Sequence, residues 1–304
     1  MGAFFIYSFP SKFYRFHIML KKFLSAALFL SLMTVLGSCD LLQNGTTTTP
    51  TTPTTPSTNP TTPKPNTPST TTSKMGILHT QSNNTVLAKY TEFNISYSTK
   101  YKNPEWASYV LTKEMIEEDV APRNSSFRND PNVKGSADNK DYTNSGFDRG
   151  HIVAAEDMNH SEKAMYESFF MTNVSPQDPS FNRGIWKSLE DKTRKWAAEN
   201  KKLYIIAGPV LPKRVSSTLQ YIGANNDVLV PKKFYKIIVD AENPSRKGIA
   251  FVFNNGENPK ALSAYACSID EVEELTGLNF FPELSAADEA LLEAKFDYSQ
   301  WDTK

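Results

Sequence analysis

The chain of 304 residues contains little cysteine and little histidine, and both shortages exclude kinds of site. Zinc is usually bound by Cys and His in closely spaced pairs, and the sequence contains neither CxxC nor HxxxH. The two cysteines are Cys39 and Cys267. A disulfide between them is not expected, because Cys39 falls in a processing signal and Cys267 lies in an apolar run, where a thiol packs rather than reacts.

Net charge is also absent, since 33 basic residues balance 33 acidic ones. Residues 1–74 hold six of the basic residues and one acidic residue, which leaves residues 75–304 with 27 basic and 32 acidic residues, a net charge of −5. A net-acidic domain is not expected to coat DNA through many lysine contacts. It is compatible with an enzyme that holds one phosphate with a divalent cation and two arginines.

A membrane-spanning run of about 20 apolar residues is missing as well. The apolar stretch Phe23–Leu36 has 14 residues, follows the basic pair in Met19–Lys22 and leads into Leu36–Cys39, which reads LGSC. A basic start, an apolar centre and small residues before a cysteine are typical of a bacterial lipoprotein signal. We therefore expect residues 1–39 to be a signal peptide with a lipobox, in which Cys39 is the residue that receives a lipid. The lipid would anchor the protein in the bacterial cell envelope. An uncleaved anchor and an ordinary secretory signal are the alternatives.

Because the signal is complete from Met19, residues 1–18 are expected to reflect a misassigned start codon, with the first methionine as the alternative. Residues 40–74 follow, and from Asn44 to Ser73 they are almost entirely Thr, Pro, Ser and Asn. They lack the apolar periodicity that a core requires, so we expect a disordered linker. A proline-rich spacer extends about 3.1 Å per residue and could hold a domain away from a membrane, whereas a flexible junction has no such reach. Residues 75–304 suffice for one large domain.

Apolar patterning in residues 75–304 predicts an α+β fold with a central antiparallel sheet and flanking helices. Strands are expected at 86–97 (one or two), 106–111, 203–207, 227–230, 234–239 and 248–253. Helices are expected at 161–170, 185–200, 268–275 and 285–296, the second with Trp186, Leu189, Thr193 and Trp196 inward. The segment 130–145 is expected to be a surface loop, and Lys192–Lys195 a solvated helix face.

The polar motifs cluster in the middle of this domain. Asp148-Arg149-Gly150-His151 places a proton acceptor beside a phosphate-binding cation, with a glycine that permits close backbone approach. The block TNVSPQ follows at 172–177, then Asn182, Trp186 and Glu190. Of the four histidines, at 17, 79, 151 and 160, only His151 has both an adjacent arginine and this polar cluster downstream.

With DRGH at 148–151, TNVSPQ at 172–177 and FN at 181–182 leading into W-x3-E at 186–190, the sequence resembles the DNA/RNA non-specific endonucleases, a family of ββα-metal nucleases. The resemblance implies a ββα-metal unit between about Phe147 and Asn200. It implies a sequence-non-specific, metal-dependent endonuclease that contacts DNA and RNA through phosphate.

The same resemblance implies roles for single residues. His151 would be the general base, Arg149 and Arg123 would bind the phosphate, and Asn173 and Glu190 would belong to the catalytic set, with Glu190 orienting metal-bound water. Asn182 would hold Mg²⁺ or Mn²⁺, which suits an amide oxygen.

Several readings of these residues stay open in the sequence. Asn173 is equally typical of a turn. Arg128 is close enough in the sequence to be the second phosphate-binding arginine in place of Arg123. Asp148 is expected to fix its loop rather than act as a base. Asn182 and Glu190 would lie about 12 Å apart on one continuous helix, so either Asn182 precedes the helix or Glu190 acts through water.

Two other functions remain open for the whole chain. One is a phosphodiesterase for nucleotides or small diesters, which the same catalytic group could serve. The other is a catalytically silent lipoprotein that binds nucleic acid or a surface. The intact set of His151, Arg149 and Asn182 argues against the silent protein.

Lipidation can be tested at one residue. Cys39→Ser removes the only side chain placed to carry the lipid, so in a bacterial host the protein should leave the detergent-extracted membrane fraction. Fractionation and immunoblotting of both forms measure this. Membrane association that survives the substitution would contradict the lipoprotein signal.

Overall fold

The structure is a computed structural model and describes residues 85–123, 126–242 and 246–302. The predicted signal peptide, its Cys39 and the linker at 40–74 lie outside these residues. Within the described ranges, no helix has the length and apolar character that a membrane crossing requires.

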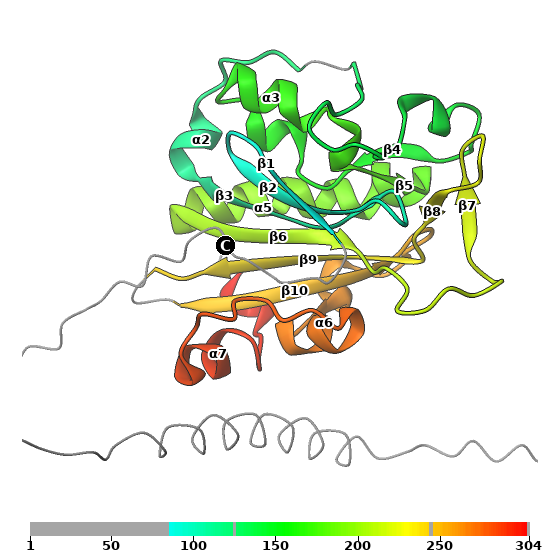
Figure 1. The fold of residues 1–304 in the computed structure, drawn as a ribbon. Helices are drawn as coiled ribbons and strands as arrows, with labels where there is room; N and C mark the ends of the chain where they lie inside the picture. Colours follow the sequence, from blue (N-terminus) through cyan, green and yellow to red (C-terminus); the bar gives the residue numbers. More distant parts are fainter. Residues whose placement is uncertain (1–84, 124–125, 243–245, 303–304) are drawn as a thin grey trace, which may run out of the picture. The chain divides into compact units, whose positions relative to one another are not determined.

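A seven-stranded antiparallel sheet is the centre of the described fold (Figure 1). In spatial order its strands are β1 (Val86–Lys89), β2 (Phe93–Ser98), β3 (Asn103–Thr112), β6 (Lys202–Pro209), β9 (Lys233–Asp240), β10 (Lys247–Asn254) and β11 (Ala266–Cys267). The inner strands β6 and β9 are buried along almost their whole length, because both faces of the sheet are covered. The predicted α+β fold with a central antiparallel sheet is confirmed.

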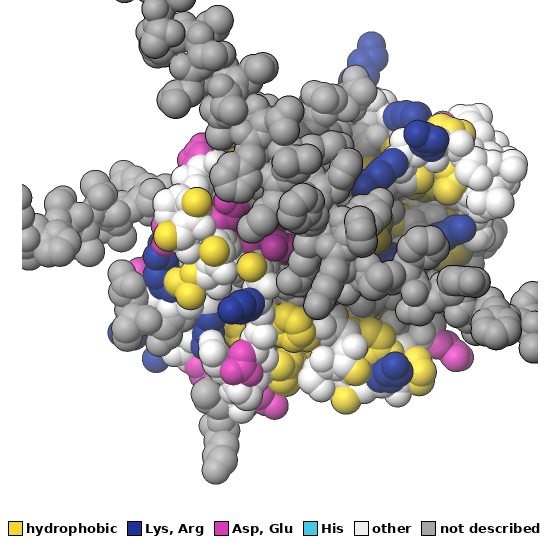
Figure 2. Space-filling view, turned by 90° about the horizontal axis from the view of Figure 1, so that it is seen from below, with side chains coloured by type: hydrophobic (Ala, Val, Ile, Leu, Met, Phe, Trp, Pro, Cys, Tyr) yellow, Lys and Arg dark blue, Asp and Glu magenta, His cyan; other side chains and the backbone are white. Residues whose placement is uncertain are grey.

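Helices cover both faces of this sheet (Figure 1). On one face lie α2 (Lys113–Glu117), α3 (Glu162–Ser168) and α5 (Lys187–Asn200); on the other lie α6 (Ile269–Thr276) and α7 (Ala286–Leu292). Each face has its own apolar core: Leu189 and Trp196 pack on the first, Ile269 and Leu292 on the second. Figure 2 views the side of α6 and α7, where hydrophobic, basic and acidic side chains are interspersed.

The long helix has the inner face that its spacing predicted. Leu189, Thr193 and Trp196 of α5 are fully buried, as is Trp186 one residue before it. The predicted N-cap Ser268 accepts the backbone N–H of Glu271 and forms a capping box with it. The last predicted helix is shorter than expected. It ends at Leu292 because the chain then turns toward α6, where the N–H of Asp270 donates to the carbonyl of Glu293 at 3.2 Å.

The ββα unit stands beside the sheet. Strands β4 (Asp148–His151) and β5 (Val174–Gln177) pair antiparallel, with Asp148 opposite Gln177 and His151 opposite Val174. A short helix, α4 (Pro179–Phe181), and a wide turn over Asn182–Trp186 follow, and then α5 begins. The chain kinks at Gly184 (φ −101°, ψ −110°). A small hairpin of β7 (Gln220–Ile222) and β8 (Val228–Val230) shares an apolar cluster with β5.

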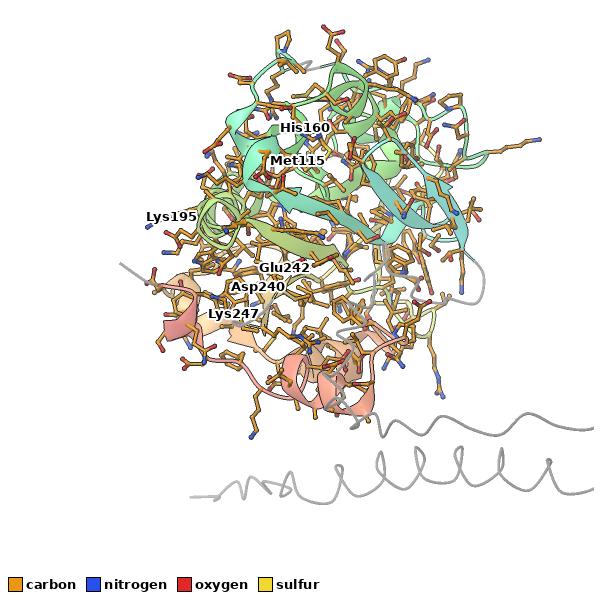
Figure 3. The ribbon with its side chains drawn as sticks, turned by 90° about the vertical axis from the view of Figure 1, so that its left-hand side faces the viewer. Met115, His160, Lys195, Asp240, Glu242 and Lys247 are labelled. Carbon is orange, nitrogen blue, oxygen red and sulfur yellow. The ribbon has the colours of Figure 1, made fainter. Side chains whose placement is uncertain are left out.

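Two surface expectations hold only in part. The segment 130–145 is a loop with exposed residues, but it is also anchored: Tyr142 is buried in the cluster under the hairpin, and Asp130 accepts the hydroxyl of Thr172 at 2.7 Å. Within Lys192–Lys195 only part of the helix face is solvated. Lys195 points outward (Figure 3), whereas the side chain of Arg194 is 18% exposed and pairs with the buried Asp157.

Candidate active site

His151 lies at the end of β4 in an aromatic enclosure. Its ring centroid is 5.0 Å from that of Phe127 and 4.8 Å from that of Phe169, whose ring meets it edge-on. Nε2 of His151 is enclosed and has no hydrogen-bond partner among the described residues. Burial lowers the pKa of His151 to about 3, and the nearby charge of Arg123 adds to this effect. The imidazole is therefore neutral at pH 7.

Two arginines flank this ring. The Arg123 guanidinium lies 5.6 Å from the centroid of Phe169, the same ring that His151 contacts. Arg149 is fixed by Asn139, because its Nε donates to the side-chain oxygen at 2.5 Å and its Nη2 donates to the backbone carbonyl at 2.8 Å. Nη1 of Arg149 takes part in neither contact. An anion beside His151 would thus meet positive charge on two sides.

The structure decides between the two candidate arginines before the acidic loop. Arg128 donates from Nη1 to the carbonyl of Tyr166 at 2.9 Å, and its guanidinium stacks 3.9 Å from the Tyr166 ring centroid. Arg123 makes only a loose contact with Glu156, at 3.5 Å between exposed side chains. Arg123, rather than Arg128, is therefore the arginine whose charge lies near His151.

Asp148 orients the predicted cation ligand. Its Oδ2 accepts the side-chain N–H of Asn182 at 2.9 Å and Nε–H of Arg183 at 2.8 Å, and its Oδ1 accepts Nη2–H of Arg183 at 2.6 Å. Burial alone would raise the pKa of Asp148, but these hydrogen bonds from Arg183 and Asn182 hold it below its usual value. Asp148 is thus a fixing group, as expected, rather than a base.

The residues present fit a hard divalent cation. Because the side-chain nitrogen of Asn182 is held by Asp148, the amide oxygen is the atom left to face a cation, and a fixed ligand orientation of this kind is what outer-sphere partners provide. An amide oxygen beside a carboxylate and several waters suits Mg²⁺ or Mn²⁺ and not zinc.

The kink at Gly184 settles the geometry of Asn182 and Glu190. Asn182 lies before the kink and Glu190 lies in the first turn of α5, so the two are not on one continuous helix. Between them, Nε1 of Trp186 donates to the carbonyl of His151 at 3.2 Å and ties the start of α5 to β4. Burial raises the pKa of Glu190 to about 7, and Lys236 opposes this effect. Asn182 therefore precedes the continuous helix that carries Glu190.

Asn173 does not belong with the catalytic groups. Its side chain is fully buried; its oxygen accepts the N–H of Val153 at 2.9 Å, and its nitrogen donates to the carbonyls of Val153 (2.9 Å) and Ser168 (2.8 Å). Both amide hydrogens are used on backbone, so none is left for a substrate. The expected catalytic role is corrected to a structural one, in which Asn173 fixes the chain directly after His151.

Sequence reasoning missed several parts of the site. Asn139, which holds Arg149, comes from the loop expected at the surface, and no local pattern marked it. Phe127 was not identified as a wall of the histidine enclosure. Gln177 belongs to the block at 172–177, but its packing was not predicted: it is fully buried against Gly150, where a Cβ would overlap its side-chain amide. Lys236 did carry a signal, as a lysine in the middle of an apolar strand whose other charged residues, Lys233 and Asp240, lie at its two ends.

Comparison with known proteins gives consistent matches. Residues 71–287 match the family model described as DNA/RNA non-specific endonuclease. The chain is 34% identical over 212 residues to human mitochondrial nuclease EXOG, covering 64% of this chain and 56% of the relative. It is 31% identical over 202 residues to human mitochondrial endonuclease G, covering 63% and 68%, and 30% identical over 221 residues to a nuclease of Nostoc sp., covering 68% and 77%.

The fold comparison agrees with these matches. A chain in the crystal structure of the EndoG/EndoGI complex superposes with a TM-score of 0.62 and 28% identity, covering 69% of this chain and 91% of that one. The chain spans less than two thirds of the EXOG nucleases that it matches, 56% of the human protein and 60% of the zebrafish protein.

Two neighbouring side chains test the cation ligand. Asn182→Ala should weaken divalent-cation binding and metal-dependent cleavage far more than Asp178→Ala, because Asp178 already caps α4 by accepting the N–H and hydroxyl of Ser180 at 2.8 and 2.6 Å. Calorimetric titration with Mn²⁺ measures both variants. A larger loss of cation affinity in Asp178→Ala than in Asn182→Ala would contradict the assignment of Asn182 as the cation ligand.

The enclosure of His151 predicts a pH dependence of stability. The folded pKa of about 3 lies below the ordinary value of 6.5, so between these values the unfolded chain binds the proton and the folded chain does not. The free energy of unfolding should therefore fall as pH is lowered from 6.5. Urea unfolding at pH 7 and pH 5 should show a larger loss for the natural protein than for His151→Gln. Equal losses in both would mean that the ring is not enclosed in solution.

Proposed function

Because the chain belongs to the DNA/RNA non-specific endonucleases, we propose that it hydrolyses phosphodiester bonds of DNA and RNA, with Mg²⁺ or Mn²⁺ held by Asn182. The observation that carries the proposal is the arrangement around β4. A neutral His151 lies between two arginines, and Asp148 of the same strand turns the amide oxygen of Asn182 outward. Phosphodiester hydrolysis needs a base, groups that stabilise negative charge, and a cation. His151 is the base, the two arginines stabilise charge, and Asn182 is the ligand for the cation.

The chain's own groups divide the work. His151 takes the proton of the attacking water, and we assign this step to Nδ1 because Nε2 is enclosed. Arg123 and Arg149 bind the negative charge that develops on the phosphate. The chemistry supplied by a bound cation is the neutralisation of the phosphate and of the leaving 3′ oxygen. With a cation held by Asn182, Glu190 would accept hydrogen bonds from the water around it. The bond from Nε1 of Trp186 to the carbonyl of His151 ties the start of α5 to β4.

Cleavage should be largely independent of base sequence. Each group assigned here acts on phosphate, water or cation, and contacts to phosphate carry no information about the bases. The net-acidic domain fits this activity, since a weak overall field favours release of the product.

Location is a separate part of the proposal. The MLKK start, the apolar stretch and the LGSC end of residues 19–39 support export and a lipid on Cys39, which would tether the enzyme to the bacterial cell envelope on the linker at 40–74. The enzyme would then act on nucleic acid outside the cytoplasm.

The proposed activity is tested with three substrates. Purified protein should cleave plasmid DNA and RNA with Mg²⁺ and not after chelation, and it should act only weakly on a small chromogenic phosphodiester. Fast hydrolysis of the small diester with intact plasmid would favour a phosphodiesterase of small esters. Binding of DNA without cleavage of any substrate would favour a silent nucleic-acid-binding protein.

His151 gives the sharpest single-residue test. His151→Ala should lower the rate of cleavage by about 10²- to 10⁴-fold, because its neutral ring is the base. Substrate binding and the thermal midpoint should change little, and both are measured on the same purified variant. A loss of rate below tenfold, or one that matches the fraction of unfolded protein, would remove His151 from the mechanism.

A further inference from the structure

One residue of the loop before β4, Asn139, holds Arg149 at two points. Nε of Arg149 donates to the side-chain oxygen of Asn139 at 2.5 Å, and Nη2 donates to the backbone carbonyl of Asn139 at 2.8 Å. The rings of Tyr142 and Phe127 lie beside the same guanidinium, with their centroids 5.6 and 6.0 Å from its central carbon. Two hydrogen bonds to one residue fix the orientation of a planar guanidinium as well as its position.

Both acceptors of Arg149 are uncharged. Arg183, by contrast, is paired with the carboxylate of Asp148, with 2.6 Å between Nη2 and Oδ1. A carboxylate offsets the positive charge of the guanidinium that it binds, whereas an amide oxygen and a backbone carbonyl leave that charge in place. Asn139 thus holds Arg149 without reducing the charge that Arg149 can present to a phosphate.

The nitrogen of the same amide reaches the enclosure of His151. Nδ2 of Asn139 donates to the backbone carbonyl of Phe127 at 3.2 Å. The ring of Phe127 is a wall of the enclosure, with its centroid 5.0 Å from that of His151. The side chain of Asn139 therefore links the arginine beside the base to the wall around the base.

The backbone of Asn139 is itself anchored. Asn139 begins the short 3₁₀ helix Asn139–Tyr142, whose N-cap Asp138 forms a capping box with Asp141. The backbone N–H of Asn139 donates to the side-chain oxygen of Asn129 at 3.1 Å, and the side-chain nitrogen of Asn129 donates to Asp138 at 2.7 Å. A side chain on a fixed backbone can hold a second side chain in one orientation.

We propose that Asn139 is a positioning residue of the active site: its amide holds Arg149 at full charge in a fixed orientation and fixes Phe127 against His151. The proposal rests on the nuclease function proposed above, because the orientation of Arg149 matters only where a phosphodiester is bound. Asn139 itself does not touch substrate.

Two substitutions separate the orientation of Arg149 from its charge. Asn139→Ala removes the side-chain acceptor and leaves Arg149 charged but held only through the backbone carbonyl. This variant should lower kcat on plasmid DNA by about 10- to 100-fold with KM nearly unchanged, because a small misplacement of a catalytic group is costly. Asn139→Asp keeps an acceptor for Arg149 but supplies a carboxylate, which offsets the charge. It should lower kcat and also weaken the binding of DNA.

The salt dependence of DNA binding measures the charge directly. A short duplex is titrated with chelator-treated protein at several salt concentrations, and binding is followed by fluorescence anisotropy. Each phosphate contact contributes about 0.9 to the slope of log affinity against log salt. Asn139→Asp should lose about one contact from this slope, as Arg149→Gln should, whereas Asn139→Ala should keep the slope of the natural protein.

Three results would overturn the proposal. One is a slope for Asn139→Asp equal to that of the natural protein. Another is a kcat for Asn139→Ala close to the natural value. The third is a double variant, Asn139→Ala with Arg149→Gln, that is much slower than Arg149→Gln alone, because a residue that acts through Arg149 has no effect once Arg149 is gone. If the natural protein binds DNA but cleaves no nucleic acid, the proposed function fails, and the salt slopes still decide the role of Asn139.

Asn129→Ala is the matched control. It removes the contact to the backbone N–H of Asn139 in the same loop and leaves the acceptors of Arg149 in place. Its thermal midpoint should fall about as far as that of Asn139→Ala, while kcat stays close to that of the natural protein. A loss of kcat as large as that of Asn139→Ala would mean that any loosening of the loop slows the reaction, and would overturn the proposal.

Discussion

The hydrogen bonds of Asp148 are the constraint on which the site depends. One carboxylate on β4 holds Asn182 and Arg183, which lie just before the kink that leads into α5. Without this link, the amide of Asn182 would be free to rotate and could present nitrogen instead of oxygen to a cation. The Asp148 carboxylate therefore determines both where the Asn182 side chain lies and which of its atoms, oxygen rather than nitrogen, faces a cation. The indole of Trp186 makes the second link, from α5 back to the carbonyl of His151.

Burial acts on the two titratable groups of the site in opposite directions. It lowers the pKa of His151 to about 3 and raises the pKa of Glu190 to about 7, since in each case it disfavours the charged form. Burial thus keeps His151 neutral at pH 7 and disfavours the ionised form of Glu190.

Local patterns predicted the parts of the fold that rest on short-range physics. The strands around Phe234–Val239 and the inner face of α5 follow from apolar spacing, and the Ser268 cap follows from its capping box. The site residues His151, Arg149 and Asn182 came from the motif and its resemblance. Contacts between segments far apart in the chain could not be read in this way. Two contacts depend on the tertiary fold: the one between Asn139 and Arg149 and the one between Arg194 and Asp157. The role of Asn173, structural or catalytic, also depended on contacts that the tertiary fold creates.

The position of the cation tests the account most directly. Crystals soaked in Mn²⁺ and measured at a wavelength where manganese scatters anomalously would locate the ion without reference to activity. The account predicts a peak roughly 2.1 Å from the side-chain oxygen of Asn182, with Asp148 still bound to the side-chain nitrogen. A peak that lies instead only at the carboxylate cluster of Asp270, Glu273 and Glu293, with none at Asn182, would contradict it.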